Sequence, residues 1–276
     1  MARLVARTVA RTPLTRPTDA PPIAHEPSPP TRFRSLTEPG NAPDRLAPPE
    51  ETPGHVAIIM DGNRRWARAR GVTELEGHAA GVETIRALLK HAVRRGIPIL
   101  SLYAFSRENW ARSDDEVSGL FALLESAITN ETDELRRQGV RIRLLGRLEE
   151  LPPATQQSID GGLSATAQGE RLLLNIAFNY AGRTEIVDAV RRIVASGRPA
   201  HEIDERTISD SLYTAGLPDP DLVIRTGGDQ RMSNFLVWQS SYAEFYFCPV
   251  LWPDFDAESF DAALVEYASR LRRFGR

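Results

Sequence analysis

The chain has 276 residues and a mass of 30.7 kDa, with 41% hydrophobic and 26% charged residues, as is ordinary for a soluble globular protein. Its formal net charge of -3 argues against a nucleic-acid-binding protein, because such proteins are usually basic. No apolar run approaches the roughly 18 residues that cross a bilayer. A single cysteine, Cys248, excludes an internal disulfide framework and favours a reducing, cytoplasmic compartment.

The first part of the chain is rich in proline. Twelve of the 20 prolines lie between Pro13 and Pro53, in a stretch without a sustained helical or strand period. Such a segment buries too little apolar surface to offset its ordering entropy, so we expect residues 1–53 to form a disordered tail. Its first residues carry arginines and no acid, which mildly resembles a transit peptide. A tail without a targeting function is the favoured interpretation. Residues 54–276 suffice for one domain with a sizeable core.

From His55 onward, short apolar runs alternate with helical periods. The runs are typical of buried strands and cover 55–60, 97–105, 140–146, 172–178, 221–225 and 244–247. Amphipathic helical stripes occupy 82–93, 117–128, 186–194 and 260–271. The second stripe begins at a capping box formed by Ser113 and Glu116. This alternation predicts an α/β fold with a mostly parallel sheet flanked by helices.

Polar motifs follow four of these runs at the point where each predicted strand ends. They read DGNRRW (61–66), SRENWAR (106–112), NYAGR (179–183) and RTGGDQRMSN (225–234), and a further acid, Glu244, opens the last run. Ligands of open parallel sheets bind beyond the carboxyl ends of the strands. We therefore expect these motifs to meet at one edge of the sheet.

The chemistry of the motifs suits phosphate. Four arginines present planar donor forks, namely Arg65, Arg112, Arg225 and Arg231. Gly62 and the pair at 227–228 let backbone amides approach an anion closely. Asp61 and Glu244 are acids amid this positive charge, which suits a magnesium ion held between carboxylates and phosphates. Taken singly, each residue also has an ordinary explanation as a surface ion pair or a helix cap, but together they predict a site for one or two diphosphates.

Several other phosphate or catalytic sites are excluded, since neither a P-loop, a dinucleotide fingerprint nor a serine-hydrolase elbow occurs in the sequence. The four tryptophans lie in or near the motifs, at positions 66, 110, 238 and 252. Large aromatics usually complete a core. The alternative is a long apolar cleft beside the polar site, which would suit an amphiphilic substrate.

Taken together, the motifs resemble the cis-prenyltransferase family, which includes undecaprenyl diphosphate synthases and shorter-chain isoprenyl transferases. The matching segments are HVAIIMDGNRRWA (55–67), GH (77–78), LYAFSRENWAR (102–112), NIAFNYAGR (175–183), DLVIRTGGDQRMSNFLVWQSSYAEFYF (221–247) and LWPDF (251–255). The resemblance covers residues 54–276 in the family's order. It implies a six-stranded, mainly parallel sheet that encloses a hydrophobic tunnel, a homodimer, and a magnesium-dependent reaction. In that reaction isopentenyl diphosphate is condensed with an allylic diphosphate, such as farnesyl or geranyl diphosphate, to a cis-polyprenyl diphosphate.

The resemblance also implies roles for individual residues. Asp61 binds magnesium and positions the allylic diphosphate, Glu244 is the second magnesium ligand, and Asn109 is the proton acceptor. The residues implied to contact the substrates are Gly62, Asn63, Arg64, Arg65, Trp66, His78, Ser106, Arg107, Glu108, Trp110, Arg112, Arg225, Arg231, Met232 and Ser233.

Two positions give conflicting indications of product length. Relatives that make long chains usually carry an arginine where this chain has Glu74, and a carboxylate there would repel an allylic diphosphate. Ala104 is the small residue associated with longer products, and it favours a medium-to-long chain. The ending Arg273-Phe274-Gly275 resembles a terminus that reaches the substrate site across a dimer interface in some relatives.

The alternatives differ in function class. A short-chain Z-prenyl diphosphate synthase is the nearest one. A non-catalytic partner subunit of the same fold is less favoured, because such partners tend to lose the acid that Asp61 represents. The chain has neither the basic net charge nor a recognisable motif of an RNA-binding protein, so no nucleic-acid partner is expected. A lipid product predicts a cytoplasmic enzyme that works beside a membrane without crossing it.

Overall fold

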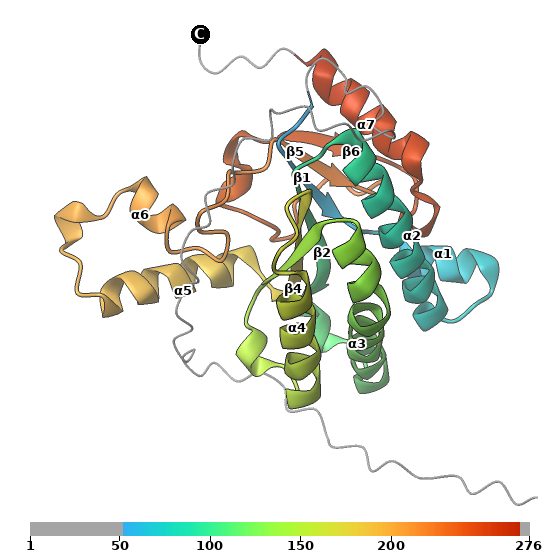
Figure 1. Ribbon diagram of the computed structural model, residues 1–276, viewed down its shortest axis with the longest axis horizontal. Helices are drawn as coiled ribbons and strands as arrows, with labels where there is room; N and C mark the ends of the chain where they lie inside the picture. The colour runs from blue at the N-terminus through green and yellow to red at the C-terminus, as the bar shows by residue number, and fades with distance from the viewer. Residues whose placement is uncertain (1–51, 271–276) are drawn as a thin grey trace, which may run out of the picture.

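Each of the predicted apolar runs corresponds to a strand in the computed structural model, which describes residues 52–270 (Figure 1). The strands are β1 (His55–Ile59), β2 (Ile99–Ser106), β3 (Val140–Leu145), β4 (Leu172–Tyr180), β5 (Leu222–Arg225) and β6 (Glu244–Phe247). They form one sheet in the order β3-β4-β2-β1-β5-β6, and every pairing is parallel. The predicted α/β class and six-stranded parallel sheet are confirmed. The predicted tail up to residue 51 and the 273–275 ending lie outside the described residues.

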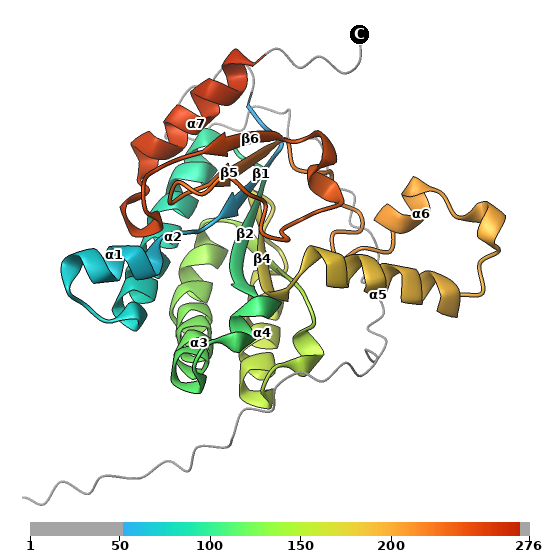
Figure 2. The same ribbon diagram turned by 180° about the vertical axis from the view of Figure 1, so that it is seen from behind.

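Helices connect the strands and cover the sheet. They are α1 (Asn63–Arg70), α2 (Glu74–Arg95), α3 (Asp114–Arg137), α4 (Pro153–Thr166), α5 (Gly182–Ala195), α6 (Glu205–Ser209) and α7 (Ala257–Ser269). Helices α2, α3 and α4 lie on one face of the sheet, and α7 lies beside α2 (Figure 1). Figure 2 shows the opposite side, where α5 and α6 project from the rest as an arm. No helix within residues 52–270 is both long and apolar enough to cross a bilayer.

The ends of the long helices follow from local sequence. Helix α2 begins at a capping box of Thr73 and Glu76, well before the predicted stripe at 82–93, and ends at Gly96 in the left-handed conformation. At the start of α3, the Ser113 hydroxyl accepts from the Glu116 amide, but the other half of the predicted capping box does not form, because the Glu116 carboxylate accepts from Arg112 instead. The polar segment 63–70 has no apolar stripe, so α1 was not predicted.

The core lies on both faces of the sheet. On one face, Leu100 and Leu102 of β2 pack with Leu88 and Leu89 of α2 and with Phe260 of α7. On the other face, β1 and β5 pack against the buried 235–236 segment that follows β5. Both faces are therefore covered, which explains why β1 is a continuous apolar run.

The predicted stripe of α5 divides between two environments. Ile193 is buried, whereas Val187, Val190 and Val194 are exposed on the projecting arm. The helix is present as predicted, but part of its apolar face lies against solvent in the single chain.

Candidate active site

The polar motifs meet where the connections of the sheet change direction. Strand β1 lies between β2 and β5, and the chain continues from β1 to β2 on one side while β5 lies on the other. Ile59, at the end of β1, is in register with both Tyr103 of β2 and Arg225 of β5. Such a switch point opens a crevice beyond the strand ends. Asp61 and Arg225 are the first polar residues at this crevice.

Asp61 is held between two arginines. Its Oδ2 accepts from Arg225 Nη2 at 2.8 Å, and its Oδ1 lies 3.1 Å from Arg65 Nη2. Partial burial raises the pKa of Asp61, but the bonds and charges of Arg225 and Arg65 outweigh it, so the pKa lies below its ordinary value. The Thr226 hydroxyl fixes the backbone by bonding both the amide and the carbonyl of Asp61. Asp61 is therefore a fixed, ionised carboxylate.

Two glycines permit this close packing. Gly62 has a φ of 121°, and a Cβ there would lie 2.9 Å from Leu251 Cα. Gly62 is also the N-cap of α1 and supplies no capping side chain, so the first-turn amides of α1 are open to an anion. At Gly227, where φ is 82°, a Cβ would lie 2.5 Å from Arg65 Nη2. The arginine can reach Asp61 only because this position lacks a side chain.

Arg225 connects Asp61 to the loop at 229–234. Its buried guanidinium also donates to the Arg231 carbonyl and to Ser233 Oγ, and it lies 3.3 Å from Asp229 Oδ2. Arg231 is exposed, and its Nη2 donates to Asp229 Oδ2 at 2.7 Å. Ser233 has a φ of 47°, in the left-handed region, which indicates a loop conformation imposed by its surroundings. The predicted cluster of Arg225, Arg231 and Ser233 therefore forms.

Asp229 is a residue to which sequence reasoning gave no role. It lies inside the quoted RTGGDQRMSN motif, four residues after Arg225 and two before Arg231. Its carboxylate orients both arginines. The sequence did contain an indication of this role, because Asp229 is an acid close to Arg225 and Arg231, which were both assigned to a diphosphate.

Several buried polar atoms at the site lack a hydrogen-bond partner among the described residues. They are Asn63 Oδ1, His78 Nε2 and Arg225 Nε. Buried polar groups are rarely left unpaired, so such atoms call for a ligand or ordered water. Burial, and then the charge of Arg112, lowers the pKa of His78, so this ring is neutral at neutral pH.

The segment after β2 forms a short 3-10 turn at 107–111 that carries several predicted contacts. Asn109 Oδ1 accepts from the Ser106 amide at 3.0 Å, and Trp110 Nε1 donates to Asn179 Oδ1 at 2.9 Å. Glu108 accepts from Asn234 Nδ2 at 2.9 Å, which joins this turn to the loop after β5. The turn is therefore anchored from both sides of the crevice.

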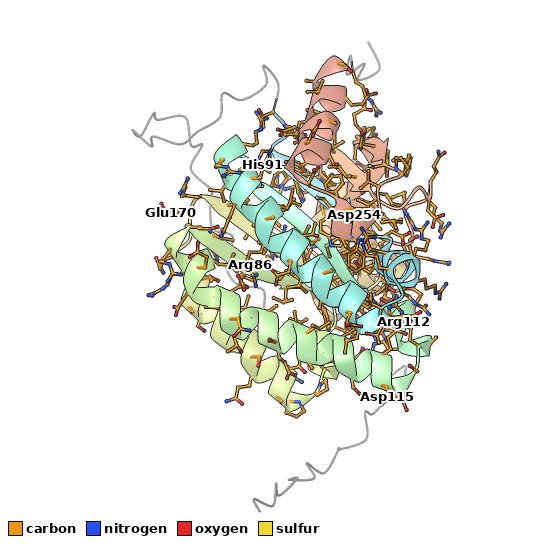
Figure 3. All side chains as sticks on the ribbon, turned by 90° about the vertical axis from the view of Figure 1, so that its right-hand side faces the viewer. Arg86, His91, Arg112, Asp115, Glu170 and Asp254 are labelled. Atoms are coloured by element: carbon orange, nitrogen blue, oxygen red, sulfur yellow. The ribbon has the colours of Figure 1, made fainter. Side chains whose placement is uncertain are left out.

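Four residues that were predicted to contact the substrates are paired with other protein groups or partly covered by them. Arg107 pairs with Glu150, and Arg112 donates to Glu116 at 2.7 Å. Trp66 Nε1 donates to Asp254 Oδ1 at 2.8 Å (Asp254 is labelled in Figure 3), and Arg70 stacks on its ring. Met232 is half-buried.

Glu74 also has charge partners. It lies 2.8 Å from Arg64 Nε and 3.1 Å from Arg68 Nη2, and the contact with Arg64 is the main reason its pKa is lowered. The two arginines offset the repulsion that a lone carboxylate would exert on a diphosphate.

Glu244 lies at the opposite edge of the sheet from Asp61. It is the first residue of β6, in register with Leu222 at the start of β5, and its carboxylate accepts from Arg270 Nη1 at 2.9 Å. Asp61 follows the carboxyl end of β1. Contrary to the sequence-based expectation, the structure does not bring Glu244 to Asp61 within one chain, because strand β6 begins rather than ends at Glu244.

An apolar cavity of about 150 Å³ leads away from the polar site. It lies between α2, α3 and the sheet, on the side that Figure 3 faces. Asn63 and His78 stand at its polar end, and Ala104 of β2 is part of its wall. Trp252, to which sequence reasoning gave no definite role, also lines it, with Nε1 bonded to the Gly81 carbonyl at 3.0 Å.

The carboxylates at the site fit a cation that takes most of its ligands from elsewhere. Within residues 52–270 there is no group of three or more His, Cys, Asp or Glu side chains that could enclose a metal ion. Magnesium is commonly bound by one or two carboxylates together with substrate phosphates and water. Asp61, amid phosphate-type donors, is compatible with that kind of site.

Comparisons with known proteins agree on one family. The undecaprenyl diphosphate synthase family model matches residues 59–275. An isoprenyl transferase of Heliobacterium mobile is 48% identical over 231 residues, which cover 82% of this chain and 89% of that protein. An isoprenyl transferase of Agrobacterium fabrum is 48% identical over 227 residues, covering 81% of this chain and 92% of that protein.

Solved structures show the same similarity. Lavandulyl diphosphate synthase from Lavandula x intermedia, in complex with dimethylallyl diphosphate, superposes with a TM-score of 0.79 at 38% identity and covers 82% of this chain and 99% of its own. A probable undecaprenyl diphosphate synthase from Campylobacter jejuni gives a TM-score of 0.70 at 33% identity and covers 83% and 100%.

Proposed function

The chain belongs to the undecaprenyl diphosphate synthase family and is a cis-prenyltransferase; from this premise we propose that it condenses isopentenyl diphosphate with an allylic diphosphate. Farnesyl or geranyl diphosphate is the proposed starter, and the product is a cis-polyprenyl diphosphate. The observation that carries the proposal is a phosphate-type site that opens directly into an apolar cavity, at Asn63 and His78. An amphiphilic diphosphate matches both parts at once.

We assign the allylic diphosphate to the start of α1. The open amides of the first turn and the guanidinium of Arg65 face the same corner as Asp61. A chain anchored there has its hydrocarbon directed past Asn63 and His78 into the cavity. The neutral His78 ring adds one hydrogen-bonding atom, Nε2, which makes no hydrogen bond within residues 52–270, although Glu116 Oε1 lies 3.7 Å away.

Isopentenyl diphosphate is assigned to Arg225, Arg231 and Ser233. Arg231 is exposed and Ser233 presents a hydroxyl, so both can turn to a diphosphate that enters from solvent. Arg225 contacts both Ser233 and Asp61, so it sets the spacing between the two diphosphates.

In the proposed reaction, the allylic carbon–oxygen bond breaks and diphosphate leaves. The isopentenyl double bond then forms the new carbon–carbon bond, and a proton is lost, for which Asn109 is the proposed acceptor. Asp61 would hold magnesium, which supplies charge stabilisation for the leaving diphosphate. Preorganised donors such as Arg65 and Arg225 stabilise the same developing charge without reorganisation.

For product length we retain the medium-to-long proposal, because Ala104 leaves the wall of the cavity open and the pairing of Glu74 with two arginines weakens the contrary indication. A short-chain Z-prenyl diphosphate synthase is the second candidate, and the modest volume of the cavity favours it.

We also propose a homodimer that works in the cytoplasm beside a membrane. The exposed valines of α5 (Val187, Val190 and Val194) support an interface on the projecting arm, since apolar stripes on projecting helices are usually covered. The lone thiol of Cys248 supports a reducing compartment.

The test is a reaction with labelled isopentenyl diphosphate, magnesium and one of three starters: dimethylallyl, geranyl or farnesyl diphosphate. Elongation that requires magnesium, with products resolved by chromatography, is the expected result. Absence of elongation with every starter would contradict the proposal and leave a non-catalytic subunit as the remaining candidate.

A further inference from the structure

One ion pair joins the two helices that line the apolar cavity. Arg86 of α2 and Glu131 of α3 form a two-pronged contact, with Nε 2.8 Å from Oε2 and Nη2 close to Oε1. The side chains are 37% and 18% exposed, so both charges are partly withdrawn from water. Figure 3 shows Arg86 in the space between α2 and α3. We call this ion pair the α2–α3 clasp.

Both residues of the clasp belong to the wall of the cavity. Arg86 lies eight residues, and therefore about 12 Å, beyond His78 along α2, and Ile85 and Leu89 beside it line the cavity. On α3, Ile128 and Leu135 flank Glu131 in the same wall. The clasp is thus a charged pair in the wall of a mainly apolar channel, away from the diphosphate site.

The far end of the cavity continues this polar character. Lys90, Glu134 and Gln138 line it beyond the clasp, and Gln138 donates to Glu134 at 2.6 Å. A hydrocarbon that grows along the cavity therefore meets apolar side chains first and charged or amide groups afterwards. Apolar chains gain little by contact with such groups.

We propose that the α2–α3 clasp limits the length of the prenyl product by holding the two helices together over the cavity. The inference rests on the proposed function, because it concerns the hydrocarbon that this reaction would extend. A chain that outgrows the enclosed space has to separate α2 from α3, and this pulls apart two charges that are only partly solvated. Elongation then stops in favour of release, so Arg86 and Glu131 are specificity-determining residues.

The test compares product ladders of purified full-length variants. Arg86→Met keeps the apolar stem of the side chain and removes its charge, and Glu131→Gln is nearly isosteric. Both are expected to shift the ladder toward products longer by one or more isoprenyl units. The double exchange Arg86→Glu with Glu131→Arg restores an ion pair of opposite direction and is expected to return the ladder toward that of the parent enzyme.

Glu83 provides a matched control. It also pairs with Arg86, but it lies on the same helix and is exposed, so it does not join α2 to α3. Glu83→Gln should leave the product ladder unchanged. A lengthened ladder in this control would show that a general loss of charge, and not the clasp, is responsible.

Total incorporation of label separates the two proposals. If the parent enzyme incorporates no isopentenyl diphosphate, the proposed function fails. If it is active and the ladders of Glu131→Gln and Arg86→Met are unchanged or shorter, the clasp is refuted while the function stands. Thermal unfolding of each variant checks the fold, and Glu131→Gln decides the matter if Arg86→Met does not fold.

Discussion

Arg225 Nη2 donates to Asp61 Oδ2 at 2.8 Å, from a guanidinium that is only 4% exposed. The same guanidinium reaches Ser233 and Asp229 in the loop after β5. A buried arginine is a rigid donor with a permanent charge, so it fixes both groups at once. The two halves of the proposed active site are therefore mechanically linked through one side chain.

Asp61→Asn should lower the rate of condensation by at least about 100-fold, the scale on which single preorganised electrostatic contacts act. The amide keeps the size of the side chain but lacks the negative charge that faces Arg65 and Arg225. Asp61 is only partly buried and lies outside the hydrophobic core, so the far-ultraviolet spectrum should remain that of the parent enzyme. Steady-state rates with saturating substrates and magnesium measure the effect. Full activity in Asp61→Asn would show that the site has been misplaced.

Arg231→Ala should raise the KM for isopentenyl diphosphate by roughly 10-fold, as expected for the loss of one charge-assisted hydrogen bond. The KM for the allylic substrate should change little, because Arg231 is exposed and contacts Asp229 rather than Asp61. Arg68→Ala is a suitable control, since this exposed arginine pairs with Glu74 outside the loop after β5. Equal changes in both KM values would contradict the assignment of the two diphosphates.

Ala104→Leu should shorten the product, because three added carbons would project from β2 into the cavity between α2 and α3. Turnover with the starter should persist, since the polar groups at Asp61 and Arg225 are untouched. Product sizing by mass spectrometry or chromatography measures the change. An unaltered ladder would remove Ala104 from the residues that control chain length.

How far the sequence predicts this molecule depends on the kind of signal. All six strands coincide with predicted apolar runs. In β1 the run at 55–60 is unbroken because the strand is buried on both faces, whereas the short β6 is only partly buried. Helix α1 was missed because the segment 63–70 is polar on most sides and is held by its position after Gly62. Motif spacing placed Asp61 and Arg225 at one edge correctly, since both follow the carboxyl ends of parallel strands.

Strand register and contacts between distant segments account for the features of the site that the sequence did not predict. Glu244 was expected beside the motifs that follow the strands, but it is the first residue of the four-residue strand β6 and therefore lies at the amino-terminal edge of the sheet, opposite Asp61. Likewise, the partners of Arg107 and Trp66 are Glu150 and Asp254, which are remote in sequence. Such pairings depend on the packing of separate connections, and no local pattern encodes them.

Buried His55 should make the stability of the protein depend on pH. Burial lowers the pKa of His55 to about 4, from an ordinary value of 6.5, although the Pro218 carbonyl and Asp221 oppose the shift. The unfolded chain therefore binds a proton at a higher pH than the folded protein does. Between pH 6.5 and about 4, the free energy of unfolding should fall as the pH falls, by roughly 3 kcal/mol in total from this group.

Unfolding in urea at a series of pH values tests this contribution of His55. In His55→Gln the slope of unfolding free energy against pH should flatten over this range, even if the loss of the bond to Ser101 Oγ lowers stability throughout. His201 is the matched control because its side chain is 82% exposed, and His201→Gln shows whether the removal of a histidine alters the slope by itself. The slope isolates proton binding from packing, so an unchanged slope in His55→Gln would mean that His55 takes up its proton equally in the folded and unfolded states.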